Sequence, residues 1–405
     1  LRTVLDADCL VLPDRLLAPG RVSIDDRGRI SAIESDAQRE PARAEDGHRF
    51  LAPGLIDLQV NGFAGVDLLD TDRAGFDAMG LALLRRGVTG YLPTLISTPI
   101  PVLLDRLETL APWCVEAEQA STPLGIHVEG PFLSPEARGT HRVQNLRAPD
   151  PALLEEILDA GQGRIRMVTL APELPGAMAM IERLREADIL VSLGHSKASY
   201  ECVLEAVDRG ATLVTHFGNA MGTLHQREPG LPGAGLAEPR LSLGLIPDLV
   251  HLHPGILRLA WRAKGREGLV LVSDAMTAAG LPDGEYTFGD RQVHVRGGVC
   301  RDEEGSLAGA SLDLHEGLNR FLDATGISPC GGFQIAAASP ARHLGVAAER
   351  GSLVTGARAD LLGMTRTREG RLRLDSVHLA GRPVSMGPDS GAPSEASPGR
   401  STRRS

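Results

Sequence analysis

Four ionisable side chains follow short apolar runs in this sequence, and a fifth lies within one. His127 and Glu129 come in LGIHVE, His195 follows ILVSLG, His216 follows ATLVT, and Asp274 follows LVLVS. Side chains two residues apart on a strand point to the same face, so His127 and Glu129 are expected to face one point. A single histidine at a strand end is more often structural than functional. Two on successive strands, with a glutamate and an aspartate on others, favour one shared site.

The residue types in this set predict a metal centre. One carboxylate and two imidazoles form a three-ligand site for a divalent ion such as Zn²⁺, with one position open for water. Such an ion lowers the pKa of its bound water towards roughly 7 and can polarise a carbonyl group. A further carboxylate, that of Asp274, could then move protons. The pattern is typical of metal-assisted hydrolysis of an amide or an ester.

The segments around these residues alternate between strand-like and helix-like text from Ala52 onward. The expected strands are 54–60, 88–94, 124–129, 165–171, 189–194, 211–216, 241–247 and 269–274. The expected helices are 74–86, 100–119, 151–159, 176–187, 198–209 and 254–263, with two more at 312–325 and 333–343. Eight strands with mostly helical crossovers predict an α/β fold of the (β/α)₈ barrel type, with an open doubly wound sheet as the alternative. In such a barrel the site lies at the carboxyl ends of the strands.

The two ends of the chain differ from this central region. Residues 1–51 and 351–386 read as short strands and turns, and we expect them to pair into one small sheet domain beside a barrel formed by residues 52–350. The segment 285–298 reads as a hairpin insertion. Residues 387–405 are rich in Pro, Ser and Gly without an apolar pattern, so we expect a disordered tail.

Composition excludes several classes of protein. The 405 residues are 42% hydrophobic and 23% charged with a net charge of −10, which argues against a nucleic-acid partner because phosphate backbones need clustered cations. The five cysteines are scattered without a CxxC pair, so a disulfide framework is not expected. The sequence shows no membrane span and no secretory signal, and we therefore expect a cytoplasmic protein without a membrane partner.

Longer motifs resemble a known family. PGLIDLQVNG, GIHVEGPFLSPEARGTH, SLGHS, THFGNAM, REPGLPGAGL and LVSDA together resemble the amidohydrolase superfamily and, within it, the N-acetylglucosamine-6-phosphate deacetylases. The resemblance covers nearly the whole chain. It implies a (β/α)₈ barrel with a small β-sandwich built from both termini. It also implies hydrolysis of the acetamide of N-acetyl-D-glucosamine 6-phosphate to D-glucosamine 6-phosphate and acetate, in amino-sugar catabolism or cell-wall recycling.

The same resemblance implies roles for individual residues. Glu129, His195 and His216 match the metal ligands, Asp274 matches the catalytic acid/base, and His141 matches a residue that contacts the substrate beside the scissile amide. Further matches are the sugar-phosphate contacts Asn219 and Ala220, the substrate contact Leu307, and the phosphate ligands Arg227 and His251. His127 either supports the metal site or is a satisfied histidine of the barrel interior. Gln59 and Asn61 stand where many amidohydrolases carry His-x-His, so we expect a single-metal site without the second ion.

Several alternatives stay open at this point. Arg227 lies in the Gly- and Pro-rich segment HQREPGLPGAG, which reads as an irregular exposed loop, and could simply be solvated. His251 could cap the next helix. Gly218 departs from the family pattern and could loosen the sugar-phosphate loop. The residues Leu312–His315 also depart from it and leave the preference between gluco and galacto substrates open. Related activities are deacetylation of N-acetyl-D-galactosamine 6-phosphate, cyclic-amide hydrolysis, or sugar-phosphate sensing without catalysis.

The implied cofactor is one divalent metal ion per subunit. We expect Zn²⁺, although a Glu/His/His set also accepts Fe²⁺, Co²⁺ or Mn²⁺. The implied partner is a small amino-sugar phosphate, and the resemblance implies a homodimer.

Overall fold

Eight parallel strands form the centre of the molecule, as the alternating pattern predicts. The computed structural model describes residues 3–35 and 49–387 of the chain. The strands are β7 (Leu55–Val60), β10 (Val88–Ile96), β12 (Ile126–Glu129), β13 (Ile165–Leu170), β14 (Leu190–Leu193), β15 (Ala211–Val214), β16 (Ser242–Leu245) and β17 (Leu269–Leu271). Each pairs in parallel with the next along the chain, and the short β11 (Thr122–Pro123) adds to the side of β10. The expected (β/α)₈ barrel is confirmed.

The barrel closes between β17 and β7 through few contacts. Val60 and Ala275 form an isolated parallel bridge, and the Asn61 backbone N–H donates to the Ala275 carbonyl at 2.8 Å. The buried carboxylate of Asp57 on β7 accepts a hydrogen bond from the Ser273 backbone N–H at 3.1 Å. A side chain thus joins the first strand to the segment that follows the last one.

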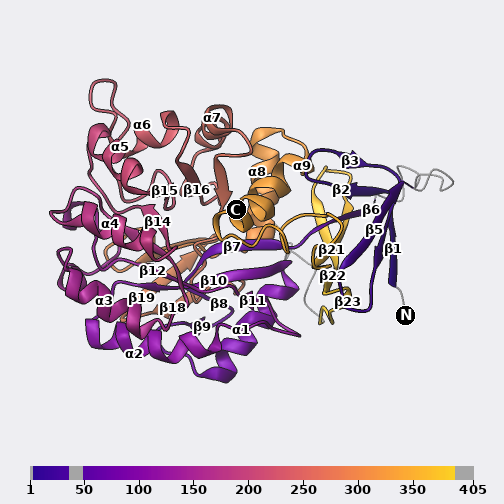
Figure 1. Cartoon of the computed structure of the whole chain (residues 1–405), viewed down its shortest axis with the longest axis horizontal. Helices are drawn as coiled ribbons and strands as arrows, with labels where there is room; N and C mark the ends of the chain where they lie inside the picture. The colour runs from indigo at the N-terminus through magenta and orange to yellow at the C-terminus, as the bar shows by residue number, and fades with distance from the viewer. Residues whose placement is uncertain (1–2, 36–48, 388–405) are drawn as a thin grey trace, which may run out of the picture.

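Helices cover the outside of the barrel (Figure 1). The helices are α1 (Arg73–Arg85), α2 (Ile100–Leu110), α3 (Pro151–Ala160), α4 (Ala177–Glu186), α5 (Tyr200–Arg209), α6 (Gly230–Ala237), α7 (Pro254–Lys264) and α8 (Leu314–Thr325). The expectation that 225–235 is irregular throughout is wrong, because α6 begins at Gly230. Five of its eight residues, Leu231 to Gly235, are buried, so tertiary packing overrides the poor helix propensity of Gly and Pro.

Two apolar layers hold the barrel together. One fills the space between strands and helices and includes Leu83, Leu107 and Ile181. The other lies inside the barrel and includes Ile56 and Met167, with Ala341 and Leu344 from the late helix α10 (Ser339–His343) and its end packed against it. Since both faces of the strands are buried, their near-continuous apolar sequence is explained. Among the described residues, no helix combines the length and apolarity needed to cross a membrane.

Both chain ends contribute to the sheets drawn at the right of Figure 1. The six-stranded sheet has the order β23 (Arg382–Pro383), β22 (Leu372–Leu379), β21 (Leu361–Arg366), β6 (Arg49–Pro53), β2 (Cys9–Val11) and β3 (Leu16–Leu17). A three-stranded sheet contains β1 (Thr3–Ala7), β4 (Gly20–Ile24) and β5 (Ile30–Ser35). Leu10 and Leu361 from the first sheet and Val22 and Ile24 from the second share one apolar cluster. The expected small β-sandwich from both termini is therefore present.

The insertion after the last barrel strand is larger than the expected hairpin. It forms a three-stranded antiparallel sheet of β18 (Gly284–Phe288), β19 (Arg291–Arg296) and β20 (Val299–Asp302). In the tail, residues 388–405 lie outside the described residues, so the expectation of disorder there is not addressed.

Candidate active site

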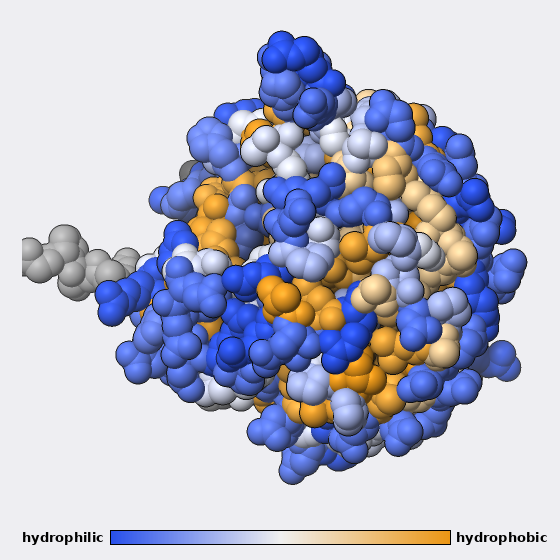
Figure 2. All heavy atoms as spheres, turned by 90° about the vertical axis from the view of Figure 1, so that its left-hand side faces the viewer, coloured by the Kyte–Doolittle hydropathy of each residue, from blue (hydrophilic) through white to orange (hydrophobic). Residues whose placement is uncertain are grey.

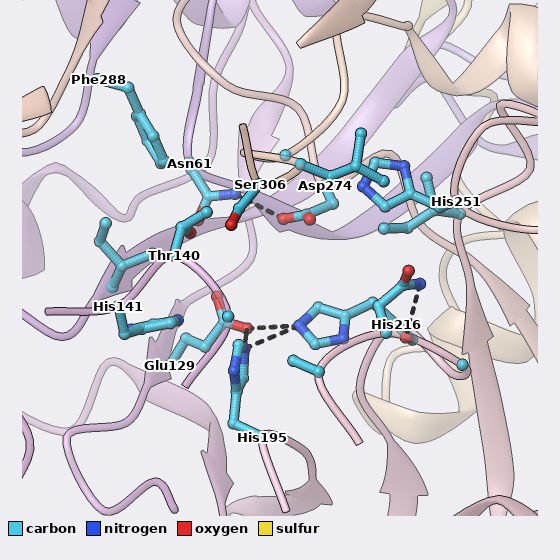
Figure 3. A pocket seen from close by; sticks show the side chains of 18 residues that line it. Asn61, Glu129, Thr140, His141, His195, His216, His251, Asp274, Phe288 and Ser306 are labelled. Carbon is cyan, nitrogen blue, oxygen red and sulfur yellow. Dashed lines mark hydrogen bonds and ion pairs between the residues drawn. The ribbon is translucent and has the colours of Figure 1, made fainter. Parts of the chain in front are cut away.

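A cavity of about 360 Å³ lies at the carboxyl ends of the barrel strands. Its lining brings together ten of the residues predicted from sequence (Figure 3). They are Asn61, Glu129, His141, His195, His216, Asn219, Ala220, His251, Asp274 and Leu307. Strand ends therefore converge as the barrel architecture requires. On the side of the molecule opposite the terminal sheets, hydrophobic patches lie among hydrophilic residues, and hydrophilic residues form most of the rim (Figure 2).

Three donor atoms converge at the bottom of this cavity. Oε1 of Glu129 lies 2.9 Å from Nε2 of His216 and 3.1 Å from Nε2 of His195, and the two nitrogens are 3.1 Å apart. All three side chains are buried. Donors about 2.0–2.2 Å from a tetrahedrally coordinated Zn²⁺ lie about 3.4 Å from one another. The three atoms thus fit a metal ion in number, chemical type and approximate spacing.

Neighbouring groups fix the orientation of these donors. Nδ1–H of His195 donates to the Ala137 carbonyl at 3.0 Å, which leaves the Nε2 lone pair of His195 directed at the cluster. Nε2 of Gln59 donates to the other carboxylate oxygen of Glu129 at 3.2 Å. Gln59 does not line the cavity, but it holds the carboxylate in place.

The three donor side chains shift one another's pKa values. Burial alone would raise the pKa of Glu129, but hydrogen bonds and charge from His195 and His216 outweigh it and hold that pKa well below its usual range. Burial lowers the pKa of His216, while the hydrogen bond and charge of Glu129 and the charge of Asp274 raise it, with a net rise. Glu129 is thus an anionic donor, and the proton that it favours on His216 would have to leave before a metal ion could bind, because a ligating imidazole is neutral.

His141 stands beside the cluster from the loop after β12. Its ring lies 4.4 Å from that of His195 at an interplanar angle of 75°, and one donor atom each of Glu129, His141 and His195 lies within 4.8 Å of the others. Burial, and then the neighbouring His195, lower the pKa of His141 to about 3, so its ring is neutral near pH 7. Its Nδ1 has no hydrogen-bond partner among the described residues. His216 is the better third donor, because it already lies within 3.1 Å of both other ligands.

Asp274 faces the cluster from the end of the last strand (Figure 3). Asn61 donates from Nδ2 to one carboxylate oxygen of Asp274 at 2.8 Å. Burial, followed by the charge of Glu129, raises the pKa of Asp274 to about 6. A carboxylate with a pKa close to neutrality can both accept and return a proton.

The strand-end residues share an uncommon backbone conformation. His195, His216 and Asp274 have φ angles of 49°, 28° and 51°. Residues other than glycine rarely adopt this left-handed region, which costs of order 1–3 kcal/mol and persists where the surrounding structure enforces it. The conformation turns each side chain away from its strand direction, and the three side chains meet in one cavity.

Comparison with known proteins places the chain among homologues. Residues 50–368 match the model of the amidohydrolase family. N-acetylgalactosamine-6-phosphate deacetylase of Escherichia coli O157:H7 is 36% identical over 83% of this chain and 86% of its own length. N-acetylglucosamine-6-phosphate deacetylase of Bacillus subtilis is 34% identical over 87% and 90%. This chain belongs to the amidohydrolase family.

Solved structures agree with this assignment. A Mycobacterium smegmatis N-acetyl-D-glucosamine-6-phosphate deacetylase variant in complex with N-acetyl-D-glucosamine-6-phosphate superposes with a TM-score of 0.86 at 32% identity, covering 95% of this chain and 100% of that one. The Thermotoga maritima N-acetylglucosamine-6-phosphate deacetylase gives a TM-score of 0.84 at 32% identity, with 95% and 99% covered. The amidohydrolase family is metal-dependent, which agrees with a Glu/His cluster that could hold an ion.

At the other end of the amidohydrolase cavity, His251 is held by Asp248. Nδ1–H of His251 donates to Oδ2 of Asp248 at 2.6 Å, and the Val250 and His251 backbone N–H groups donate to Oδ1. The ring of His251 is thereby fixed with its second nitrogen free to face the cavity. The helix-capping alternative for His251 is wrong, because His253 caps α7 by accepting from the Gly255 backbone N–H at 3.1 Å.

Two other sequence candidates do not line the cavity. His127 is fully buried in the barrel interior, where Thr169 Oγ1 lies 2.8 Å from its Nε2 and Thr94 Oγ1 lies 3.4 Å from its Nδ1. Burial lowers the pKa of His127 to about 4, so it is neutral. Arg227 is exposed in the segment that precedes α6. Figure 1 shows a loop beside α6 that projects beyond the barrel. Within one chain, Arg227 is not brought to the site.

Sequence reasoning did not find the part of the wall that the insertion contributes. Phe288 at the end of β18, and Ser306 after β20, line the cavity although the insertion was predicted only as a hairpin. Neither residue type carries a chemical signal by itself. Their position depends on how the insertion folds back over the barrel.

Proposed function

We propose that this amidohydrolase removes the acetyl group from an N-acetyl-D-hexosamine 6-phosphate. N-acetyl-D-glucosamine 6-phosphate is the substrate that we favour, with D-glucosamine 6-phosphate and acetate as products. The observation that carries the proposal is a buried Glu129–His195–His216 cluster beside Asp274 in one cavity. The named activities of the relatives and the substrate complex of the Mycobacterium smegmatis protein support the same reaction.

In this proposal, Glu129, His195 and His216 hold one divalent ion per subunit, which we take to be Zn²⁺ because carboxylate and imidazole donors suit it. When bound, the ion would activate water and polarise the acetamide carbonyl. The neutral amides Gln59 and Asn61 are directed at Glu129 and Asp274, which supports a site for a single ion.

Asp274 moves the proton in the proposed reaction. As a carboxylate it accepts a proton from the attacking water, and as a carboxylic acid it returns that proton to the leaving amine. The hydrogen bond from Asn61 keeps one oxygen of Asp274 fixed, so that the other can face the substrate. His141, neutral and without a partner among the described residues at Nδ1, would orient the carbonyl oxygen and donate a hydrogen bond as negative charge develops there.

The sugar phosphate is proposed to lie towards His251, with Asn219, Ala220 and Leu307 along it. Arg227 would complete the phosphate site from a neighbouring copy of the chain, in a homodimer. The exposure of Arg227 and of the nearby apolar Leu224, which is 56% exposed, supports this arrangement.

N-acetyl-D-galactosamine 6-phosphate is the second candidate substrate, since a relative with 36% identity carries that activity in its name. We further propose that residues 1–51 and 351–386 form one folding unit and residues 52–350 the catalytic one. The five free cysteines suit a reducing compartment such as the cytoplasm.

One set of measurements tests this function. The purified protein should contain about one divalent ion per chain and release acetate from N-acetyl-D-glucosamine 6-phosphate far faster than from the unphosphorylated sugar. Faster release from the galacto isomer would reverse the order of the two candidates. Full metal content with no release from any of the three sugars would favour a sensing role and overturn the proposal.

A further inference from the structure

A second cavity of about 320 Å³ adjoins the first one. The two share four lining residues, and these form the partition between them. They are Ile96, Thr140, His141 and Phe288. The far walls of the second cavity include the apolar Leu69 and Val102 together with the polar Thr98 and Asn145. A volume of about 320 Å³ would hold about ten water molecules of roughly 30 Å³ each.

The chemistry of the substrate decides which of its ends meets this partition, a step that rests on the proposed function. In a 6-phosphorylated 2-acetamido sugar, C2 and C5 lie opposite one another across the ring, so the phosphate and the acyl group are at opposite ends. His251, the proposed phosphate contact, lies on one side of the Glu129–His195–His216 cluster. Phe288, Thr140 and His141 lie on the other (Figure 3). The acyl methyl group therefore points towards Phe288.

Phe288 is held firmly at this position. It is 6% exposed and packs with Met276, Val293 and Ala308. The turn that follows it is fixed on one flank, where the Gly289 backbone N–H donates to Oδ2 of Asp67 at 2.6 Å.

On the other flank, Arg142 donates from Nη2 to the Asp290 carbonyl at 3.0 Å, and its Nε lies 2.5 Å from Oδ2 of Asp290. Arg142 directly follows His141, so the same contact ties the tip of the insertion to the segment that carries the carbonyl-orienting histidine. The partition is thus a fixed wall.

We infer that Phe288 determines the length of the acyl chain that the enzyme accepts. Its ring limits the hydrolysed amide to acetyl, because it separates the acyl group from a second cavity large enough for a longer chain. A hydrophobic wall discriminates by about 10–200-fold for each added methylene. Removing the ring would join the two cavities and let a butyryl chain extend beyond the partition.

The experiment compares kcat/KM for N-acetyl- and N-butyryl-D-glucosamine 6-phosphate in the wild type, Phe288→Ala and Phe288→Leu. Tyr286→Ala is the matched control, because Tyr286 lies on the same strand and packs on the same cluster but lines neither cavity. We expect the wild type to prefer acetyl by at least 100-fold. Phe288→Ala should reduce that preference at least tenfold, Phe288→Leu should reduce it less, and Tyr286→Ala should leave it unchanged.

Failure of this inference is distinguishable from failure of the proposed function. A wild type that releases no acetate would overturn the deacetylase proposal itself. An active wild type that cleaves the butyryl substrate as well as the acetyl one would remove the role of Phe288. The role of Phe288 would also be excluded if both Phe288 variants kept the acetyl preference unchanged and had the metal content and circular dichroism of the wild type. If Phe288→Ala does not fold, Phe288→Leu alone decides the question, because leucine keeps most of the apolar contact.

Discussion

At the scale of single residues, the buried cavity brings together side chains whose pKa values are shifted in different directions. Glu129 is held ionised by two imidazoles, His141 is held neutral, and Asp274 has a pKa of about 6. Separation of pKa values between neighbouring groups assigns them different roles within the same cavity. Asp274 is therefore the group best placed to exchange a proton near neutral pH.

Replacing Asp274 by asparagine should remove this exchange and little else. Asparagine keeps the size of the side chain and an oxygen that can accept from Asn61, so the fold and the Glu129–His195–His216 cluster should be unaffected. We expect kcat to fall by about 10²–10⁴-fold, measured as acetate release, with metal content unchanged by elemental analysis. Turnover equal to that of the wild type would exclude Asp274 as the proton-transfer group.

Asp57 lies deeper in the barrel and predicts a pH effect on stability. Burial raises the pKa of the Asp57 carboxyl to about 7, well above its usual range, so the folded protein binds the proton more tightly than the unfolded chain does. Stability then falls as pH rises from about 4 to about 7. The Asp57→Asn variant has no carboxyl at this position, so it does not lose stability in this way as the pH rises. Between pH 5 and pH 8 its free energy of unfolding should gain about 3 kcal/mol relative to the wild type, measured by urea denaturation of metal-free protein. A difference between the two proteins that stays constant with pH would contradict the shift.

At the scale of elements, close approach between strand ends is what brings the ligands together. Gly194 directly follows β14 and precedes His195, and a Cβ at this position would lie 2.9 Å from Cγ2 of Thr169 and from Cβ of Thr215. Thr169 lies on β13 and Thr215 directly follows β15, and both side chains are buried. A side chain at residue 194 must displace one of three strand ends.

We expect Gly194→Ala to weaken metal binding at least tenfold, because His195 and His216 would move apart. Competition with a chelator of known affinity measures this. Gly222→Ala is the control, since residue 222 has open space around it and no left-handed backbone. Equal metal affinity in both variants would show that the strand ends can adjust.

The elements that sequence predicts well are those whose pattern is local. The barrel strands are apolar on both faces and alternate with amphipathic helices, so each strand or helix can be predicted from a pattern of about ten residues. Glu129, His195, His216 and Asp274 follow from that frame because Glu129 ends a strand and the other three lie just beyond strand ends. Helix α6 was missed because its Gly- and Pro-rich text has poor propensity and is stabilised by packing. Phe288 was missed because only the tertiary fold brings the insertion to the cavity.

At the scale of the whole molecule, a buried ion-pair network connects the barrel to the terminal sheets. Arg350 and Asp360 are 6% and 5% exposed at their side chains and are paired with each other. Asp360 also accepts from Arg358 at 2.8 Å and from the Ala380 backbone N–H at 2.8 Å, and Arg350 contacts Glu116 at 2.6 Å. This network links the segment after α2, the segment that leads into β21 and the turn after β22.

Removing Asp360 should therefore destabilise the protein strongly. Asp360→Ala removes one of the two carboxylates paired with the buried Arg350, and also the acceptor of the Ala380 backbone N–H, which costs about 3–5 kcal/mol. Asp375→Ala removes a more exposed carboxylate, paired with Arg373 at 2.8 Å, and should cost about 0–1 kcal/mol. Chemical denaturation of both variants tests the difference. Equal, small losses would mean that the network does not hold the two parts together.

The pairing of β6 with β21 also sets the order in which the protein can be completed during translation. Pro53 pairs with Leu361, so a ribosome adding about 5–20 residues per second needs on the order of 15–60 s between them. During that interval β2 and β6 present an unpaired strand edge on the nascent chain, and such edges promote aggregation. We expect protease cleavage around 49–53 in chains stalled near residue 350 and protection once β21 has emerged; protection already at 350 would contradict this order. The six-stranded terminal sheet can therefore form only after the barrel segment has been synthesised.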